Sequence, residues 1–545
     1  MSTLGGPSRA YMSSPVISKL FKNLTNSKPQ AQPGDKIKVH NVISAASFAY
    51  EKIRNAVDYN EEHLIRKNAI YRILKRKLML EKVILENYLL DRYHSENMAE
   101  QLLQELIRGR YIKDVPKTMI EEIDQIIQKY NDLITKIKET SGNLDKKYFQ
   151  KLLEMAAVEI EQTLIPPNKE KSIATAMFTV MNPMIDLSDD TIDQKEKELQ
   201  LYINTYRVLY KWDDIMIRYM LINLFYPEWK HADEKLITKI ANNIDKVNIQ
   251  FEKHLNHPWR KKIISILSKK AIIFHVLTDV WENKEKDIDS IVEDPELFEA
   301  EIKKACEKRY KGVRVKLNRG VVRSIIYVFF TKMLLALVLE FPYDYYLAGE
   351  VNYDTVAINI LFPPVLMFLV AIMISMPKKQ NTAEIIQQIN SIVKNGHTTK
   401  KFVLKHPKAR GFAPKLVFNL IYTATFLFSI FVLFGFLFQL GFNLFSSLIF
   451  IMFLTLVSFF GIRIRRPVKE LLAVEKRDNI ISSIVDFFAL PFVSMGRWMS
   501  TKFSKINFLA FLMDFIIEAP FKLLINVFED LFGFLKEKKD DVMNE

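Results

Sequence analysis

No Asp, Glu, Lys or Arg interrupts residues 416–462, which read LVFNLIYTATFLFSIFVLFGFLFQLGFNLFSSLIFIMFLTLVSFFGI. A helix needs about 20 apolar residues to cross the hydrocarbon core of a bilayer, so these 47 residues are long enough to cross it twice. A polar, glycine-containing point near the middle, residues 439–443 (QLGFN), has the composition of a turn. The stretch therefore predicts two membrane-spanning helices, at residues 416–438 and 443–462.

Two further spans are predicted upstream. Residues 356–376 carry no charge and are followed by Pro377 and two lysines, and their internal Pro363 and Pro364 are tolerated in a lipid helix that has neighbours. Residues 321–341 are also apolar, but they contain Lys332 and Glu340. A charge at the bilayer centre costs about 2.5–3.5 kcal/mol on insertion scales, so hydropathy alone leaves this span weak.

The charges of the segments that flank the four candidate spans support the span at 321–341. Residues 301–323 contain nine Lys or Arg against two Glu, residues 377–415 nine against one, and residues 463–479 six against three acids. Residues 342–355 contain three acids and no base. Four spans place all three basic segments on one side of the membrane, as the positive-inside rule expects. We therefore predict a multi-pass protein of the cell (plasma or inner) membrane with both termini cytoplasmic and a transmembrane domain at 321–462.

The remainder of the chain predicts an all-α protein. No glycine occurs between Asn143 and Lys311, which is unusual for architectures built on strands and turns. We expect a soluble cytoplasmic helical domain at 36–320 with a short coiled-coil-like seam, preceded by a disordered arm at 1–35. Helices are predicted at about 42–57, 60–93, 95–111, 118–140, 144–164, 189–226, 232–255, 259–281 and 295–310.

Residues 463–535 are apolar but repeatedly interrupted by polar residues, a pattern that predicts amphipathic helices lying in the cytoplasmic interface. A hairpin that enters the bilayer and returns is the alternative for residues 480–535. A charged tail follows at 536–545, and residues 380–394 form a shorter amphipathic segment. The basic side chains expected to contact anionic lipid headgroups are Arg463, Arg465, Arg466, Arg497, Lys502 and Lys505.

Two segments of this C-terminal part are VDFFALPF at residues 485–492 and FIIEAPF at residues 515–521, whose spacing differs, so they do not form a repeat. With the surrounding residues 480–538, they resemble the C-terminal part of multi-pass bacterial membrane proteins of uncharacterised activity. The resemblance covers about the last 230 residues and implies a membrane location, without implying an activity or functional residues.

No sequence motif for a catalytic, cofactor or metal site is present. Phosphate-binding loops, dinucleotide-binding glycine patterns, zinc-protease motifs and nucleophile elbows are all missing from the sequence. The pairs His254/His257 and Asp91/His94 have metal-like spacing, but each is better explained as helix-end or surface residues. We predict no cofactor. The single cysteine, Cys306, rules out an intramolecular disulfide.

The net charge of +14 is compatible with nucleic acid or with anionic lipid as a partner. The basic run at 72–82 lacks the aromatic and groove-reading residues that nucleic-acid binding requires, so we interpret it as a solvated helix face. Nucleic acid is therefore not expected as a partner, and a bilayer with anionic headgroups is.

Lys332 and Glu340 form the candidate intramembrane polar pair. Eight residues along an α-helix correspond to about 80° of rotation, so the two side chains share a broad face. They either line a path for an ion or solute, or Glu340 extends to the far interface while Lys332 pairs inside the helix bundle. The sequence favours the second interpretation, because it lacks the paired broken helices that transporters typically show.

Three hypotheses for the function follow. The leading one is a membrane-anchored helical scaffold or regulatory protein, which recruits a protein partner through residues 36–320 and leaves homo-oligomerisation open. The alternative is a transporter or channel with Lys332 and Glu340 in its path. The third is a membrane enzyme acting on lipid or cell-envelope substrate through Asp486, Asp514 or Glu518, ranked last because no histidine lies near these acids in the sequence.

Overall fold

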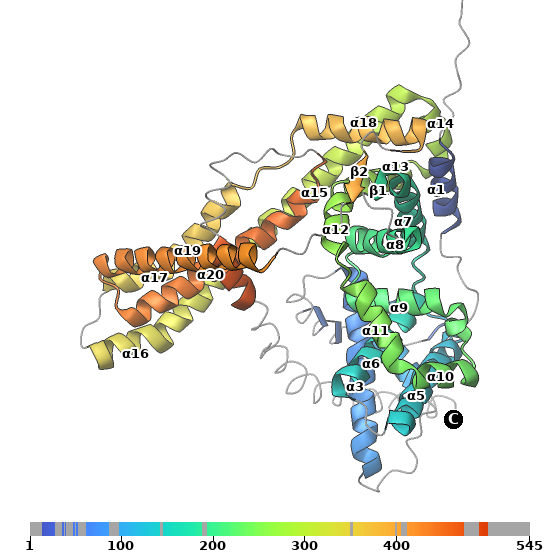
Figure 1. The fold of residues 1–545 in the computed structure, drawn as a ribbon, viewed down its shortest axis with the longest axis horizontal. Coiled ribbons are helices and arrows are strands. Elements are labelled where there is room, and N and C mark those ends of the chain that lie inside the picture. Colours follow the sequence, from blue (N-terminus) through green and yellow to red (C-terminus); the bar gives the residue numbers. More distant parts are fainter. Residues whose placement is uncertain are drawn as a thin grey trace, which may run out of the picture. The chain divides into compact units, whose positions relative to one another are not determined.

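The protein is described by a computed structural model, shown in Figure 1. The described residues are 14–27, 35–37, 39, 47–48, 51–52, 61–86, 98–141, 145–187, 193–348, 353–397, 401–404, 411–473 and 490–499. The chain forms two compact units. We call them the membrane unit (residues 1–19, 179–190 and 265–507) and the helical unit (residues 20–178, 191–264 and 508–545).

The described residues are overwhelmingly helical, which confirms the predicted all-α class. Strand occurs in two three-residue segments, β1 (Ile185–Leu187) and β2 (Phe402–Leu404), which pair in parallel within the membrane unit. The first helix, α1 (Pro15–Asn26), lies within residues 1–35, where a disordered arm was predicted; that prediction is wrong for these residues, whose apolar side chains Ile17, Leu20 and Leu24 are buried. A helix is observed where 60–93 was predicted. The helices that follow α1 are α3 (Glu62–Glu86), α4 (Met98–Arg108), α5 (Met119–Ser141), α6 (Lys146–Leu164), α7 (Asn168–Met181), α8 (Gln194–Tyr210), α9 (Asp214–Phe225), α10 (Glu234–Asn242), α11 (Ile244–Leu255) and α12 (Arg260–Ser268).

Three long helices predicted from the sequence are each broken in two. The helix predicted at 189–226 ends at Lys211, whose φ of 57° is left-handed, and restarts where the Asp213 side chain accepts from the backbone N–H groups of Ile215 and Met216. That carboxylate is a helix N-cap, which begins the second helix. The predictions at 232–255 and 259–281 are also divided, giving α10 with α11, and α12 with α13 (Ala271–Asn283), but without a side-chain N-cap at either break. The helix α7 was not predicted.

A buried ion pair lies in the core of the helical unit. The Lys129 ammonium donates to Glu159 Oε1 at 2.5 Å and to the Trp229 carbonyl at 3.1 Å. The Trp229 indole donates to the second Glu159 oxygen at 3.2 Å, and the Tyr130 ring meets Trp229 edge-on. Because both charges are hydrogen-bonded as well as paired, α5 and α6 are joined to residues 227–231 without an uncompensated buried charge.

In the membrane unit, four helices are long and apolar enough to cross a bilayer, as predicted. The first runs from Pro295 to Tyr346 and comprises α15 (Pro295–Leu335), two π-helical turns at Ala336–Glu340 and Asp344–Ala348, and α16 (Phe341–Tyr343) between them. The other three are α17 (Tyr353–Ile372), α19 (Phe412–Gln439) and α20 (Leu444–Lys469).

The first span is continuous with the helix that precedes it. The sequence predicted a helix at 295–310 and a separate span at 321–341, whereas α15 runs through both and through the predicted domain boundary at 320. Gly312 and Gly320 do not interrupt it, because a helix tolerates single glycines at a modest cost. The segment before the membrane is therefore rigidly coupled to the first span.

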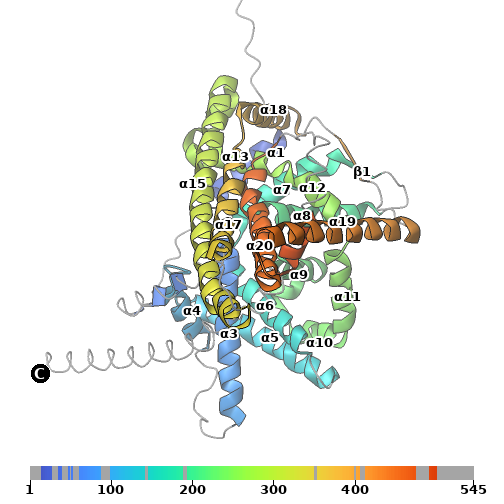
Figure 2. The ribbon, with the colours of Figure 1, turned by 90° about the vertical axis from the view of Figure 1, so that its left-hand side faces the viewer.

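Three of the four spans pack together. Figures 1 and 2 show α15, α17 and α20 running side by side, and their shared core includes Val328, Met367, Phe453 and Val457. A side-chain carbon added to Gly461 of α20 would lie 2.6 Å from Val370 of α17, so glycine permits their close approach. The helix α19 packs against α20 near the turn between them, through Leu437 and Phe450.

The segment between the second and third spans folds against the helices that precede the first. The helix α18 (Lys379–Asn395) packs on α13 and α15, and the apolar face predicted for residues 380–394 is buried there. After α18, strand β2 pairs with β1. The Lys270 ammonium donates to Gln388 of α18 at 2.7 Å. This amphipathic helix therefore covers protein rather than lipid.

The side chain of Asn381 joins three segments that are distant in sequence. Its amide nitrogen donates to Tyr310 Oη of α15 at 2.9 Å and to the Leu471 carbonyl, just after α20, at 2.8 Å. Its oxygen accepts from the Ala473 backbone N–H at 2.8 Å. We call this group of contacts the Asn381 junction.

Residues 490–499 are helical and lie against the middle of α20. A side-chain carbon added to Gly496 would lie 2.1 Å from the Thr455 carbonyl, and Thr455 Oγ1 contacts Met499 Sδ at 3.5 Å. At 1.5 Å per residue, Thr455 is about 12 Å along α20 from Arg463. Other residues of 480–535 lie outside the described part of the chain.

Candidate functional site

A polar cluster is buried between α15, α17 and α20. Lys332 and Glu340, the pair singled out from the sequence, form an ion pair, and both side chains are 0 % exposed. The Asn359 amide of α17 donates to the other Glu340 oxygen at 2.7 Å. The Lys332 ammonium also lies 5.0 Å from the centre of the Phe453 ring of α20. Lys332 is thus paired inside the bundle, as the second interpretation expects, whereas Glu340 is buried beside it and does not extend to the interface.

The π-helical turn at Ala336–Glu340 brings the two charges together. Residues 332 and 340 of a regular α-helix would be offset by about 80°. A π-turn has more residues per turn, which rotates Glu340 back toward the Lys332 face. Pro342 follows directly, and a proline ring clashes with the carbonyl four residues earlier, so a regular helix is disfavoured here.

A second set of polar contacts lies at the end of α20 nearest the turn to α19. Asn443 accepts from the Ser446 backbone N–H at 2.8 Å, which caps α20, and its amide nitrogen donates to Asp344 at 2.6 Å. Two buried oxygens close to the ion pair, Asn359 Oδ1 and Ser447 Oγ, have no hydrogen-bond partner among the described residues. Each can bond to a water or to a small polar ligand.

The basic residues predicted to meet lipid are placed differently from one another. Arg463, Arg465 and Arg466 are exposed in the last turns of α20. Arg497 is exposed on the helix that packs beside Thr455, away from those three arginines. Lys502 and Lys505 lie outside the described residues, as do Asp486, Asp514 and Glu518 of the enzyme hypothesis.

The metal-like histidine pair has another role. His254 and His257 approach the same Glu196 oxygen at 3.1 and 3.5 Å, and Gln200 donates to it as well. Within the part of the chain that is described, no group of three His, Cys, Asp or Glu is arranged to hold a metal ion. Asp91 and His94 lie outside that part.

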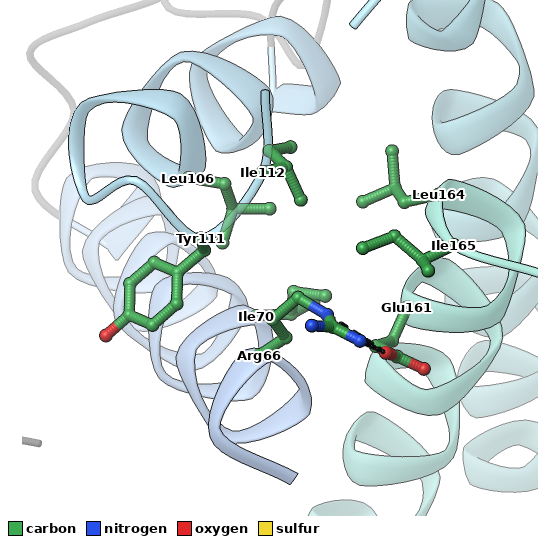
Figure 3. Close-up of a pocket in the computed structure, with 8 residues that line it drawn as sticks. All are labelled: Arg66, Ile70, Leu106, Tyr111, Ile112, Glu161, Leu164 and Ile165. Atoms are coloured by element: carbon green, nitrogen blue, oxygen red, sulfur yellow. Dashed lines mark hydrogen bonds and ion pairs between the residues drawn. The ribbon is translucent and has the colours of Figure 1, made fainter. Parts of the chain in front are cut away.

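A small hollow in the helical unit was not anticipated from the sequence. Figure 3 shows it lined by apolar side chains, among them Ile70, Leu106 and Ile165, and closed on one side by an ion pair. Arg66 donates to Glu161 Oε1 through Nε at 3.1 Å and through Nη2 at 2.9 Å. The sequence offered no signal for this pair, because α3 and α6 meet only in the folded chain.

Burial shifts two titratable groups in this region in opposite ways. Burial raises the pKa of Glu161 to about 7, although the Arg66 cation acts to lower it. Burial also lowers the pKa of the nearby His63 to about 4, and the charge of Arg66 adds to that effect. Neutral forms are therefore favoured at both positions.

Comparisons with protein-family models, with curated proteins and with solved structures match nothing to this chain. The function is therefore argued from the geometry alone.

Replacing Lys332 by Leu is expected to destabilise the membrane unit by about 3–5 kcal/mol, because it leaves the buried Glu340 carboxylate unpaired. The double variant Lys332→Leu/Glu340→Leu is expected to recover most of that loss. The measurement is the unfolding free energy of the full-length protein in lipid bicelles. Equal losses in the single and double variants would show that the pair does not compensate buried charge.

The pH dependence of the helical unit is expected to separate Glu161 from His63. The raised pKa of Glu161 adds stability at low pH that is lost as pH rises from about 4.5 to 7, and the lowered pKa of His63 adds stability that is lost as pH falls from about 6.5 to 4. As pH rises from about 4.5 to 7, the unfolding free energy of Glu161→Gln should therefore rise by about 3 kcal/mol relative to the wild type. As pH rises from about 4 to 6.5, the unfolding free energy of His63→Asn should fall relative to the wild type by a similar amount.

Hydrogen exchange of α3 and α6 amides in the full-length protein, corrected for intrinsic rates at each pH, measures both differences. If the unfolding free energies of both variants changed with pH as that of the wild type does, the pKa shifts assigned to Glu161 and His63 would be contradicted.

Proposed function

We propose that the protein is a membrane-anchored helical scaffold, whose helical unit recruits a protein partner at the cytoplasmic face of the cell membrane. The observation that carries this proposal is the Asn381 junction. It supports an anchor in which segments outside the bilayer fold together on one side of the membrane. The membrane-spanning helices hold those segments there.

The junction also supports the proposed sidedness. It joins α15 before the first span, α18 between the second and third spans, and residues 471–473 after the fourth. Segments in direct contact lie on the same side of a bilayer, so an even number of crossings separates each from the next. The basic character of all three segments favours the cytoplasmic side, which is the positive-inside argument.

The position of residues 490–499 favours the re-entrant alternative for part of the C-terminal region. Thr455 is near the middle of α20, so a helix packed on it through Gly496 enters the depth of the bilayer rather than lying at its surface. Small residues at such contacts are typical of helix packing in membranes.

A partner surface is favoured on α9 and α11, which pack together in the helical unit. Leu224 of α9 is 49 % exposed and Ile249 of α11 is 69 % exposed. Tightly bound partners bury apolar side chains of this kind at the centre of an interface.

Transport is the second candidate, and one observation favours it. Asn359 Oδ1 and Ser447 Oγ are buried beside a charged pair and next to a π-helical turn, a feature found often at functional sites. In that case liposomes containing the protein should conduct an ion or solute, and Lys332→Leu/Glu340→Leu should abolish the flux. Unchanged flux in this folded variant would remove the pair from any transport path.

Photo-crosslinking tests the scaffold hypothesis. A photoreactive amino acid at Ile249 or Leu224 is expected to yield a discrete crosslinked protein in native membranes, because both positions would be covered by the partner. The matched control is the same substitution at Asp132, an exposed position on α5. No specific product at either apolar position, or an identical product from the control, would overturn the proposed surface.

Cysteine accessibility tests the sidedness. In intact spheroplasts a membrane-impermeant maleimide is expected to label Tyr346→Cys but not Lys311→Cys, and in inside-out vesicles the pattern reverses. Trp498→Cys is expected to be protected in both until detergent is added, if its helix is re-entrant. The native Cys306 is buried and serves as the background control. Labelling of Lys311→Cys in spheroplasts would contradict the proposed orientation.

A further inference from the structure

Basic side chains gather where three chain segments meet the apolar part of the membrane unit. They are exposed residues of α15, of the start of α18 and of the end of α20. We call the following set the basic collar: Arg314, Lys316, Arg319, Arg323, Lys378, Lys379, Arg463, Arg465, Arg466 and Lys469.

The collar residues have no carboxylate partner among the residues that the structure describes. The helical unit behaves differently, since its bases are paired repeatedly, as in Arg76 with Glu105 and Arg207 with Asp214. The contrast also occurs along α15 itself. Arg309 forms a two-pronged ion pair with Asp279, whereas the collar bases of α15, from Arg314 to Arg323, have no such acid among the described residues. An anion from outside the described chain therefore fits the collar.

Apolar packing places the three basic segments at one level. Leu317 and Val321 of α15 form a buried cluster with Val468 of α20, and Ile374 and Met376, which precede α18, pack against it. In Figures 1 and 2 the helices α15 and α20 run side by side. The collar cations are therefore immediate neighbours of the apolar surface of the spans, at the height where a lipid headgroup meets its acyl chains.

We propose that the basic collar binds anionic phospholipid, with the headgroup phosphates on the Arg and Lys side chains and the acyl chains along α15 and α20. Arginine favours this ligand because its planar guanidinium can donate two parallel hydrogen bonds to one phosphate. Nucleic acid fits less well, because it has no apolar part to match the exposed side chains directly below the collar, such as Val322 and Ile326.

This inference deepens the proposed function, because bound anionic lipid would fix the height and orientation of the segments outside the bilayer at the membrane surface. It does not depend on which side of the membrane the collar faces, since lipid retention in detergent is independent of sidedness. A failed cysteine-accessibility test would thus overturn the proposed orientation and leave the lipid site intact. A failed lipid-retention test would overturn the lipid site and leave the orientation intact.

Native mass spectrometry of the full-length protein in detergent tests the proposal, with phosphatidylglycerol and phosphatidylcholine as probes. The wild type is expected to retain phosphatidylglycerol preferentially. Two triple variants, Arg463→Gln/Arg465→Gln/Arg466→Gln and Arg314→Gln/Arg319→Gln/Arg323→Gln, should each lower that retention at least about fivefold, given the attraction that each juxtamembrane base contributes.

Two further variants make the result specific. Lys138→Gln/Lys146→Gln/Lys147→Gln removes three exposed charges from the helical unit and should leave retention unchanged. Changing the three arginines of α20 to Lys keeps the charge and should retain most of the binding, which guards against loss through misfolding. Equal retention of both lipids, or an equal loss in the helical-unit control, would overturn the proposal. Displacement of the lipid by millimolar glycerol phosphate would assign the collar to soluble phosphate instead.

Discussion

The amide side chain of Asn381 makes the contact on which the arrangement of the membrane unit depends. Its hydrogen bonds bring together α15 before the first span, α18 and the residues after α20. On this ground we propose that the three segments lie on one side of the bilayer. The amide satisfies one donor and one acceptor of the backbone after α20, groups that would be costly to bury unpaired. The same contact unites the parts of the chain that carry the basic collar.

The polar cluster inside the bundle contributes to the structure in a different way. Lys332 and Glu340 are each unfavourable in an apolar environment, and together with Asn359 they form a neutral, hydrogen-bonded group. A buried pair of this kind adds little net stability but penalises every arrangement that separates its members. It therefore specifies how α15 and α17 pack, a role that lipid-facing residues with interchangeable apolar contacts cannot perform.

The two units use charge in contrasting ways. In the helical unit, bases such as Lys129 and Arg66 are matched by carboxylates, so the unit is internally compensated. In the membrane unit, the bases of the collar are exposed and have no carboxylate partner among the described residues, which favours the proposed compensation by lipid phosphates. This division agrees with a protein whose helical unit meets other proteins and whose membrane unit meets a charged lipid surface.

The sequence by itself determined the helical class and four helices long and apolar enough to span a membrane, and it singled out Lys332 and Glu340, because apolar length and isolated charge are local properties. It misjudged the helices at 189–226 and 295–310, although the Asp213 cap was readable as a start signal. Only the tertiary structure decided that α18 is covered by protein, that residues 490–499 pack beside Thr455, and that Arg66 meets Glu161. Those outcomes depend on contacts between segments far apart in sequence, which no local pattern encodes.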